Sequence, residues 1–216
     1  MMKIKRFVFN PFQENTYLVE SPEGKCLIVD PGAYDREEKE ILLANLRGKE
    51  PEAVLLTHGH PDHLASAGLL QRELGLKVFM HPDDADVPSH IAGPLAAHLD
   101  LEFETTPLCD GQVLQLLGLE CKVIHTPGHS PGGVCYWFES ENVLFTGDTL
   151  FRGTIGRTDL YKGEYDDLIR SVMDKIMGLP GCTDVLPGHA GATTIAEERT
   201  ENPFLQPFNE PEENLE

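Results

Sequence analysis

The sequence is poor in basic residues. It contains 17 Lys and Arg against 36 Asp and Glu, which gives a formal net charge of −19 at pH 7. A field of this sign repels phosphate backbones and anionic lipid surfaces. We therefore expect a protein that binds neither nucleic acid nor membranes.

Cysteines and long apolar segments are also scarce. The five cysteines are odd in number and form no C-x-x-C pair, so reduced thiols in a cytoplasmic protein are the simplest interpretation. No apolar stretch is long enough to span a bilayer, and the basic segment 1–7 is not followed by the apolar core of a secretory signal. At 216 residues, 40% of them hydrophobic, the chain suffices for a single domain over 1–216.

The most informative segment reads Thr-His-Gly-His-Pro-Asp-His over residues 57–63. Imidazole and carboxylate groups are the ligands that hold zinc or iron at neutral pH. His58 and His60 are two residues apart, so an extended backbone points both side chains the same way. An apolar strand over 53–56 precedes the segment, and its proline suits the start of a helix over 62–74. This arrangement predicts a metal-binding loop.

Three further apolar segments are each followed by a potential ligand. They lead to His129, Asp148 and His189. Taken singly, such residues are more often turn or hydrogen-bonded residues than ligands. Their recurrence after apolar strands favours one site, built from strand-end loops over a rigid sheet.

These segments resemble the metallo-β-lactamase superfamily and, within it, the short single-domain branch of the glyoxalase II-like hydrolases. The similar segments run in the family's order along the chain, at residues 14–19, 28–32, 57–63, 125–129, 145–149, 153–159 and 187–189. The resemblance implies an α+β fold, a four-layer αββα sandwich with the metals at one edge of the two sheets. Helices are expected over 35–47 and 166–177, and an acidic C-terminal extension from about residue 197.

The resemblance also implies a dinuclear centre. The residues that would hold the first metal are His58, His60 and His129; those that would hold the second are Asp62, His63 and His189; and Asp148 would bridge the two. The two divalent ions would be zinc in the first instance, with iron or manganese as alternatives. They would share a water, lower its pKa toward about 7 and so supply a hydroxide.

The activity implied is hydrolysis of small hydroxyacyl thioesters such as S-lactoylglutathione, with Asp62 and Asp148 as catalytic residues. Arg157 is the best candidate for binding an anionic part of the substrate, and an ion pair with Asp159 that only shapes the loop is the alternative. Only 27 residues follow His189, so we expect the basic contacts of a helical C-terminal domain to be missing. The oligomeric state is not predicted.

Two other activities use a similar ligand set. One is a mononuclear iron persulfide dioxygenase, and the other is a metal-dependent lactonase. β-Lactamase activity is less expected, because the resemblance places a bridging carboxylate at Asp148. Four other histidines are not expected to bind the metals: His125 would act through a hydrogen bond behind the ligands, and His81, His90 and His98 are interpreted as surface or local structural residues.

Overall fold

The computed structural model describes residues 2–91, 99 and 102–206. Its first sheet contains, in spatial order, β1 (Lys3–Phe9), β2 (Glu14–Glu20), β3 (Lys25–Val29), β4 (Glu50–Leu55), β5 (Lys77–Met80) and β6 (Thr105–Pro107). The second contains β14 (Thr193–Thr194), β13 (Asp184–Pro187), β10 (Val143–Gly147), β9 (Val134–Phe138), β8 (Leu119–His125) and β7 (Val113–Leu116). A small ribbon of β11 (Leu150–Phe151) and β12 (Thr154–Ile155) lies beside the second sheet.

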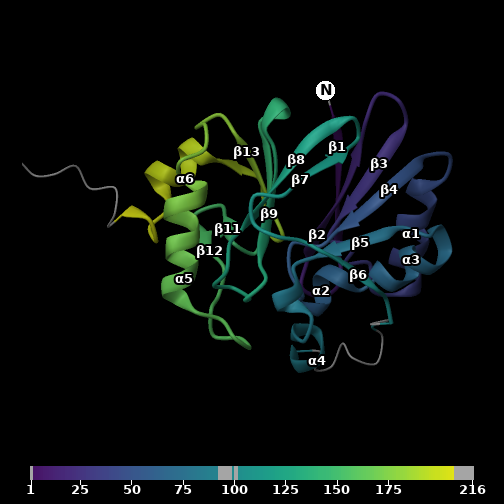
Figure 1. Ribbon diagram of the computed structural model, residues 1–216, viewed down its shortest axis with the longest axis horizontal. Coiled ribbons are helices and arrows are strands. Elements are labelled where there is room, and N and C mark those ends of the chain that lie inside the picture. The colour runs from purple at the N-terminus through teal and green to yellow at the C-terminus, as the bar shows by residue number, and fades with distance from the viewer. Residues whose placement is uncertain (1, 92–98, 100–101, 207–216) are drawn as a thin grey trace, which may run out of the picture.

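Helices cover the outer faces of both sheets (Figure 1). The first sheet is covered by α1 (Arg36–Leu46) and α3 (Ala67–Leu74), and short helices α2 (Pro61–Leu64) and α4 (Val87–Ile91) lie near its edge. The second is covered by α5 (Tyr165–Arg170), which continues as a π-helix over Ser171–Ile176, and by α6 (Ile195–Glu201). The expected four-layer α+β sandwich is confirmed. Among the described residues, no helix is long and apolar enough to cross a membrane.

Alternation along the strands builds the layers. In β2, Tyr17 and Val19 pack between the two sheets, whereas Leu18 faces the helices of the first sheet. Successive side chains of a strand point to opposite faces, so a continuous apolar run can fill two layers at once. The inner layer is completed by residues of the second sheet such as Tyr136 and Phe145, both fully buried.

The expected helix over 62–74 is interrupted. Ser66 donates its backbone N–H to the Pro31 carbonyl at 2.8 Å and its hydroxyl to the Ala33 carbonyl at 2.6 Å. These bonds replace part of the helical ladder, and α2 therefore ends before α3 begins. The break anchors the histidine-rich segment to the loop that follows β3.

Two other expectations need refinement. The acidic extension from about residue 197 begins inside α6, because Thr194 caps that helix by accepting from the Glu197 N–H at 3.1 Å. Residues 207–216 of the extension and His98 lie outside the described residues. The polar segment 81–107 is more regular than expected, since it includes α4 and β6.

Parallel pairing determines where the strand ends lie. β3, β4 and β5 are parallel neighbours in the first sheet, and β10 is parallel to β13 in the second. The carboxyl ends of parallel strands meet at one edge of a sheet. The loops after these strands therefore gather at a common edge of the sandwich.

Candidate metal centre

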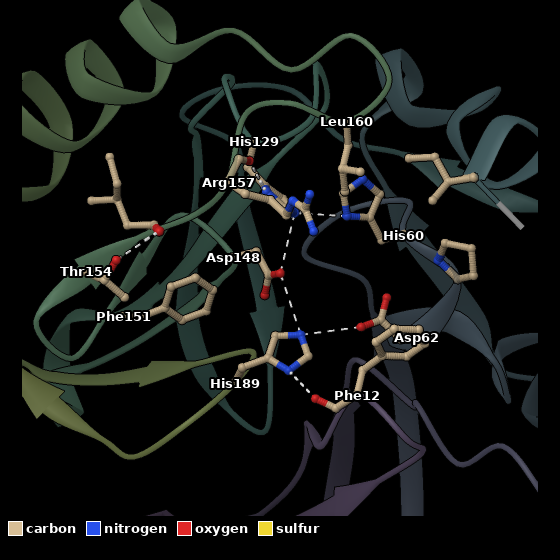
Figure 2. Close-up of a pocket in the computed structure, with 13 residues that line it drawn as sticks. Phe12, His60, Asp62, His129, Asp148, Phe151, Thr154, Arg157, Leu160 and His189 are labelled. Carbon is tan, nitrogen blue, oxygen red and sulfur yellow. Dashed lines mark hydrogen bonds and ion pairs between the residues drawn. The ribbon is translucent and has the colours of Figure 1, made fainter. Parts of the chain in front are cut away.

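The structure brings together all seven residues that the sequence singled out. Their potential ligand atoms form two groups, and within each group these atoms lie within 4.8 Å of one another. The first group contains His58, His60, His129 and Asp148, and the second contains Asp62, His63 and His189. Figure 2 shows several of these side chains converging on one pocket from separate loops.

Asp148 lies between the groups. Its Oδ2 is 3.4 Å from His129 Nε2 in the first group and 3.6 Å from His189 Nε2 in the second. Its Oδ1 is 3.4 Å from His63 Nε2. A carboxylate that reaches both groups from the end of β10 is well placed to be shared by two cations.

Hydrogen bonds hold a proton of three of the histidines on the side away from the site. His63 Nδ1–H donates to Asp30 Oδ2 at 3.0 Å, His129 Nδ1–H donates to the Arg157 carbonyl at 2.7 Å, and His189 Nδ1–H donates to the Phe12 carbonyl at 3.1 Å. When a metal is bound, each of these three rings can therefore present an unprotonated Nε2 to the centre, which is the form that binds a metal.

The Nδ1 proton of His58 is also held away from the centre, here through the hydroxyl of Thr57. The Thr57 hydroxyl donates to Asp30 Oδ2 at 2.7 Å, so its oxygen can only accept from His58 Nδ1 at 3.0 Å. The other ring nitrogen, His58 Nε2, is buried without a hydrogen-bond partner.

Two further features fit a cation. Asp148 Oδ1 is buried without a hydrogen-bond partner, and His60 Nδ1 lies 2.9 Å from His129 Nε2. Buried polar atoms left unpaired are costly, and two ring nitrogens can face each other so closely only across a proton or a metal. The donor set of imidazoles and carboxylates therefore fits divalent ions such as zinc, iron or manganese.

The electrostatics of the centre also favour positive charge. Burial opposes the charged form of His63, but the Asp148, Asp62 and Asp30 carboxylates outweigh it and raise the pKa of this imidazole well above its usual range. In contrast, burial and the neighbouring histidines lower the pKa of His58 and His60. The carboxylates that hold a proton on His63 would equally hold a divalent cation.

Asp84 is a site residue that sequence reasoning missed. Its carboxylate is fully buried and accepts three hydrogen bonds, from the Gly59 N–H at 2.7 Å, the Ser130 hydroxyl at 2.8 Å and the Gly132 N–H at 2.5 Å. Burial raises its pKa. Gly59 belongs to the loop of His58 and His60, whereas Ser130 and Gly132 belong to the loop of His129, so Asp84 ties these two ligand loops together.

A sequence signal for Asp84 existed but was weak. It follows β5, which is parallel to β4, so its loop had to reach the same edge as the histidine-rich segment. Glu14 was also missed as a site residue. It is buried beside Asp30 and His63, with Oε1 unpaired and Oε2 accepting from the Thr16 hydroxyl, and burial raises its pKa well above the usual range.

One sequence pattern is not functional. Residues 128–132 read Gly-His-Ser-Pro-Gly, which matches the Gly-x-Ser-x-Gly pattern of serine hydrolases. Ser130 is fully buried, and its hydroxyl donates to Asp84 instead of pairing with a histidine. It is therefore a structural residue of the loop.

The other histidines that the structure describes, His81, His90 and His125, lie outside the two ligand groups. His125 Nε2–H donates to the Pro131 carbonyl at 2.9 Å, which supports the loop of His129 from behind. Its ring stacks on His81 with the planes 6° apart, and the two rings lie close to the exposed Asp83. His90 stacks on Tyr161.

Arg157 lies at the pocket and is paired with Asp159. Its Nε and one terminal nitrogen each donate to a carboxylate oxygen of Asp159 at 2.7 Å. This bidentate pair lowers the pKa of Asp159 to about 2. The loop-shaping pair anticipated for Arg157 is thus present, and the backbone carbonyl of Arg157 also orients His129.

A pocket of about 510 Å³ opens onto the centre. Its lining includes five of the seven potential ligands, together with several apolar side chains. The residues are Phe12, His60, Pro61, Asp62, Ile91, His129, Asp148, Phe151, Thr154, Ile155, Arg157, Leu160 and His189.

Comparison with known proteins agrees with this geometry. The hydroxyacylglutathione hydrolase GloC of Haemophilus influenzae is 32% identical over 94% of this chain and 98% of its own length. A solved structure titled as the di-iron-bound form of TTHA1623 is 38% identical, with a TM-score of 0.79 over 93% of this chain and 100% of that chain. The structure of BLEG-1, titled a B3 metallo-beta-lactamase, is 33% identical, with a TM-score of 0.85 over 95% of this chain and 99% of that chain.

The family match is equally broad. Residues 9–193 match the model of the metallo-beta-lactamase superfamily, whose members use metal ions. This range includes all seven residues of the two ligand groups. The chain therefore belongs to the metallo-beta-lactamase superfamily, and it is a metal-dependent hydrolase.

Proposed function

We propose that this hydrolase cleaves thioesters of small hydroxy acids, with S-lactoylglutathione as the representative substrate. The observation that carries the proposal is the pair of ligand groups joined by Asp148. The similarity to GloC, which is named a hydroxyacylglutathione hydrolase, supports the choice of substrate.

Two divalent ions would be held by the seven residues described above, with zinc as the first candidate and iron or manganese as alternatives. When bound, they would supply a hydroxide nucleophile at neutral pH and polarise the substrate carbonyl. The di-iron form of TTHA1623 supports a dinuclear centre on this fold but leaves the choice of metal open.

The protein's own groups position the reactants. Burial disfavours ionisation of Asp62, but His63 and His189 outweigh it and hold the pKa of this carboxyl well below its usual range. Asp62 therefore stays ionised and can accept a hydrogen bond from the attacking water, which orients it toward the carbonyl. Asp148 holds the two ligand groups at a constant spacing.

The leaving group is consistent with a thioester. A departing thiolate is stable without a proton, whereas an amine must be protonated as it leaves. Among the pocket-lining residues that the structure describes, the side chains outside the ligand set are Arg157, Thr154 and apolar groups. None of these is a good general acid near neutral pH, so peptidase action is not expected.

β-Lactam hydrolysis is a second candidate. BLEG-1, named a B3 metallo-beta-lactamase, is 33% identical, and its similarity extends over 95% of this chain. The lactonase and persulfide dioxygenase alternatives rest on the ligand set alone.

Steady-state kinetics on metal-replete protein would test the proposal. S-lactoylglutathione, a homoserine lactone and a penicillin should be assayed side by side, with Asp148→Ala as the inactive control. We expect thioester cleavage that is lost in Asp148→Ala. Efficient opening of the lactone or the penicillin without thioester cleavage would overturn the assignment.

A further inference from the structure

The wall of the pocket away from the ligands is apolar. Besides Pro61, which lies between two ligands in the sequence, five of its thirteen lining residues present hydrocarbon side chains: Phe12, Ile91, Phe151, Ile155 and Leu160. Figure 2 shows Phe151 beside Asp148 and His189, and Leu160 on the other side of the pocket next to His60. A substrate whose carbonyl lies at the centre would therefore meet aromatic and aliphatic carbon on both sides.

Positive charge for an anionic substrate is limited. Arg157 is the single Lys or Arg among the lining residues in the described part of the chain, and Asp159 occupies it through two hydrogen bonds of 2.7 Å. Glutathione carries two carboxylates, which need basic partners to replace their hydration. The pocket offers more to a neutral apolar group than to such an anion.

The apolar wall is held in shape by contacts on its outer side. Asp86, just before α4, accepts from the Tyr161 hydroxyl at 3.0 Å and from Lys162 Nζ at 2.8 Å. His90 of α4 stacks on the Tyr161 ring with centroids 3.9 Å apart. These contacts join α4, which carries Ile91, to the loop that carries Leu160, so two sides of the pocket are pre-organised.

We infer that the pocket takes an apolar, uncharged acyl group of about four to eight carbons. The inference rests on the proposed thioester hydrolysis and names its preferred acyl class. A lactoyl group would fill only a small part of the 510 Å³, whereas a medium-length chain can bury its methylenes against Phe151 and Leu160. The acyl side is assigned to the wall because the polar lining residues outside the ligand set, Thr154 and the exposed Arg157 with its partner Asp159, can meet only the thiol side.

A chain-length series tests the inference. Acetyl, butanoyl, hexanoyl and octanoyl thioesters of the neutral thiol N-acetylcysteamine should be compared on metal-replete protein. We expect kcat/KM to rise about threefold per added methylene until the pocket is full. The hexanoyl thioesters of N-acetylcysteamine and of glutathione should also be compared. Their kcat/KM values should differ by a smaller factor than the acetyl and octanoyl thioesters do in the chain-length series.

Two variants locate the effect. Phe151→Ala and Leu160→Ala should each lower kcat/KM about tenfold for the hexanoyl thioester and about twofold or less for the acetyl thioester. Val113→Ala, on an exposed face of β7 away from the pocket, is the matched control and should change neither value. The metal content of each variant should also be measured. Unchanged metal content shows that the lower kcat/KM comes from the lost apolar contact and not from a disturbed metal centre.

The outcomes distinguish this inference from the proposed function. Thioester turnover with a flat chain-length series, or a strong preference for the glutathione thiol at constant acyl group, would overturn the inference alone. No cleavage of any thioester would overturn the proposed function and the inference with it.

Discussion

Asp84 and Ser130 lie on different loops and meet through a hydrogen bond of 2.8 Å at the base of the metal centre. The same Asp84 carboxylate also accepts hydrogen bonds from the Gly59 and Gly132 N–H groups, so it acts only as an acceptor. Gly132 lies so close that a Cβ there would be 2.7 Å from the Asp84 nitrogen. This single buried carboxylate therefore bonds to both histidine loops at once.

Asp84→Asn should weaken metal binding without touching a ligand. The amide has one acceptor oxygen in place of two, and its NH₂ would face a donor. We expect metal affinity to fall about 10–100-fold and the free energy of unfolding to fall by about 2–4 kcal/mol. Competition with a chromogenic chelator and denaturant melts would measure the two effects, with exposed Asp83→Asn as the control. Unchanged metal affinity in Asp84→Asn would show that the loops hold their spacing without it.

Asp148→Ala and His125→Ala should behave differently. Asp148 reaches both ligand groups, so its removal should abolish turnover and weaken both sites. The His125 ring bonds to the Pro131 carbonyl behind the loop and stacks on His81, so its removal should keep most of the metal and lower activity about 10–100-fold. Metal analysis and kinetics on both purified variants would decide, and similar losses in the two would contradict the roles assigned.

Metal-replete protein should contain close to two metals per chain. Chelation should also lower the melting temperature, since binding to the folded state stabilises it. Elemental analysis of protein purified without added metal, followed by thermal melts before and after chelation, would check both points. One iron per chain, with oxygen uptake on glutathione persulfide, would instead support the dioxygenase.

Arg157→Ala should raise KM for S-lactoylglutathione more than it lowers kcat, the pattern expected when binding is lost equally from substrate and transition state. Asp159→Asn is the matched variant, because it releases the Arg157 side chain from its bidentate pair. That variant should lower KM for the same anionic substrate and leave KM for a neutral thioester unchanged. If Arg157→Ala leaves KM unaltered, Arg157 only shapes the loop.

The metal-free protein should lose stability as pH rises above about 6.5, the usual pKa of histidine. The pKa values of His63 and His189 are raised in the folded state, and that of Glu14 is raised as well. Above pH 6.5 the unfolded chain releases these protons while the folded protein retains them, so the stabilisation that they give is lost through this window. The lowered pKa values of His58 and His60 act in the opposite direction, mainly below pH 6.5. Denaturant melts at pH 6.5 and 8.5 should show the loss in chelated protein and a smaller loss in metal-loaded protein. Equal stability of the chelated protein at both pH values would contradict the assignment.

Much of the candidate centre could be predicted because its signals are local. The His-x-His-x-Asp-His segment names four potential ligands within six residues, 58–63, and the other three directly follow apolar strands. The interruption between α2 and α3 could not be predicted in this way, since it depends on Ser66 bonding to Pro31 and Ala33 of another segment. The Gly-His-Ser-Pro-Gly segment shows that a local match to a motif can mislead. It matches the serine-hydrolase pattern, but Ser130 is buried and bonds to Asp84, so it cannot act as a nucleophile.

The sequence by itself determined the type of chemistry, because ligand identity, strand periodicity and net charge are properties of residues and short segments. The tertiary structure decided which nitrogen of His63, His189 and His129 faces the centre, since their acceptors are Asp30 and the Phe12 and Arg157 carbonyls of distant segments. It also decided the pairing of Arg157 with Asp159 and the apolar pocket wall. These features depend on side chains that meet only when both sheets and their loops are assembled, and no local pattern specifies such meetings.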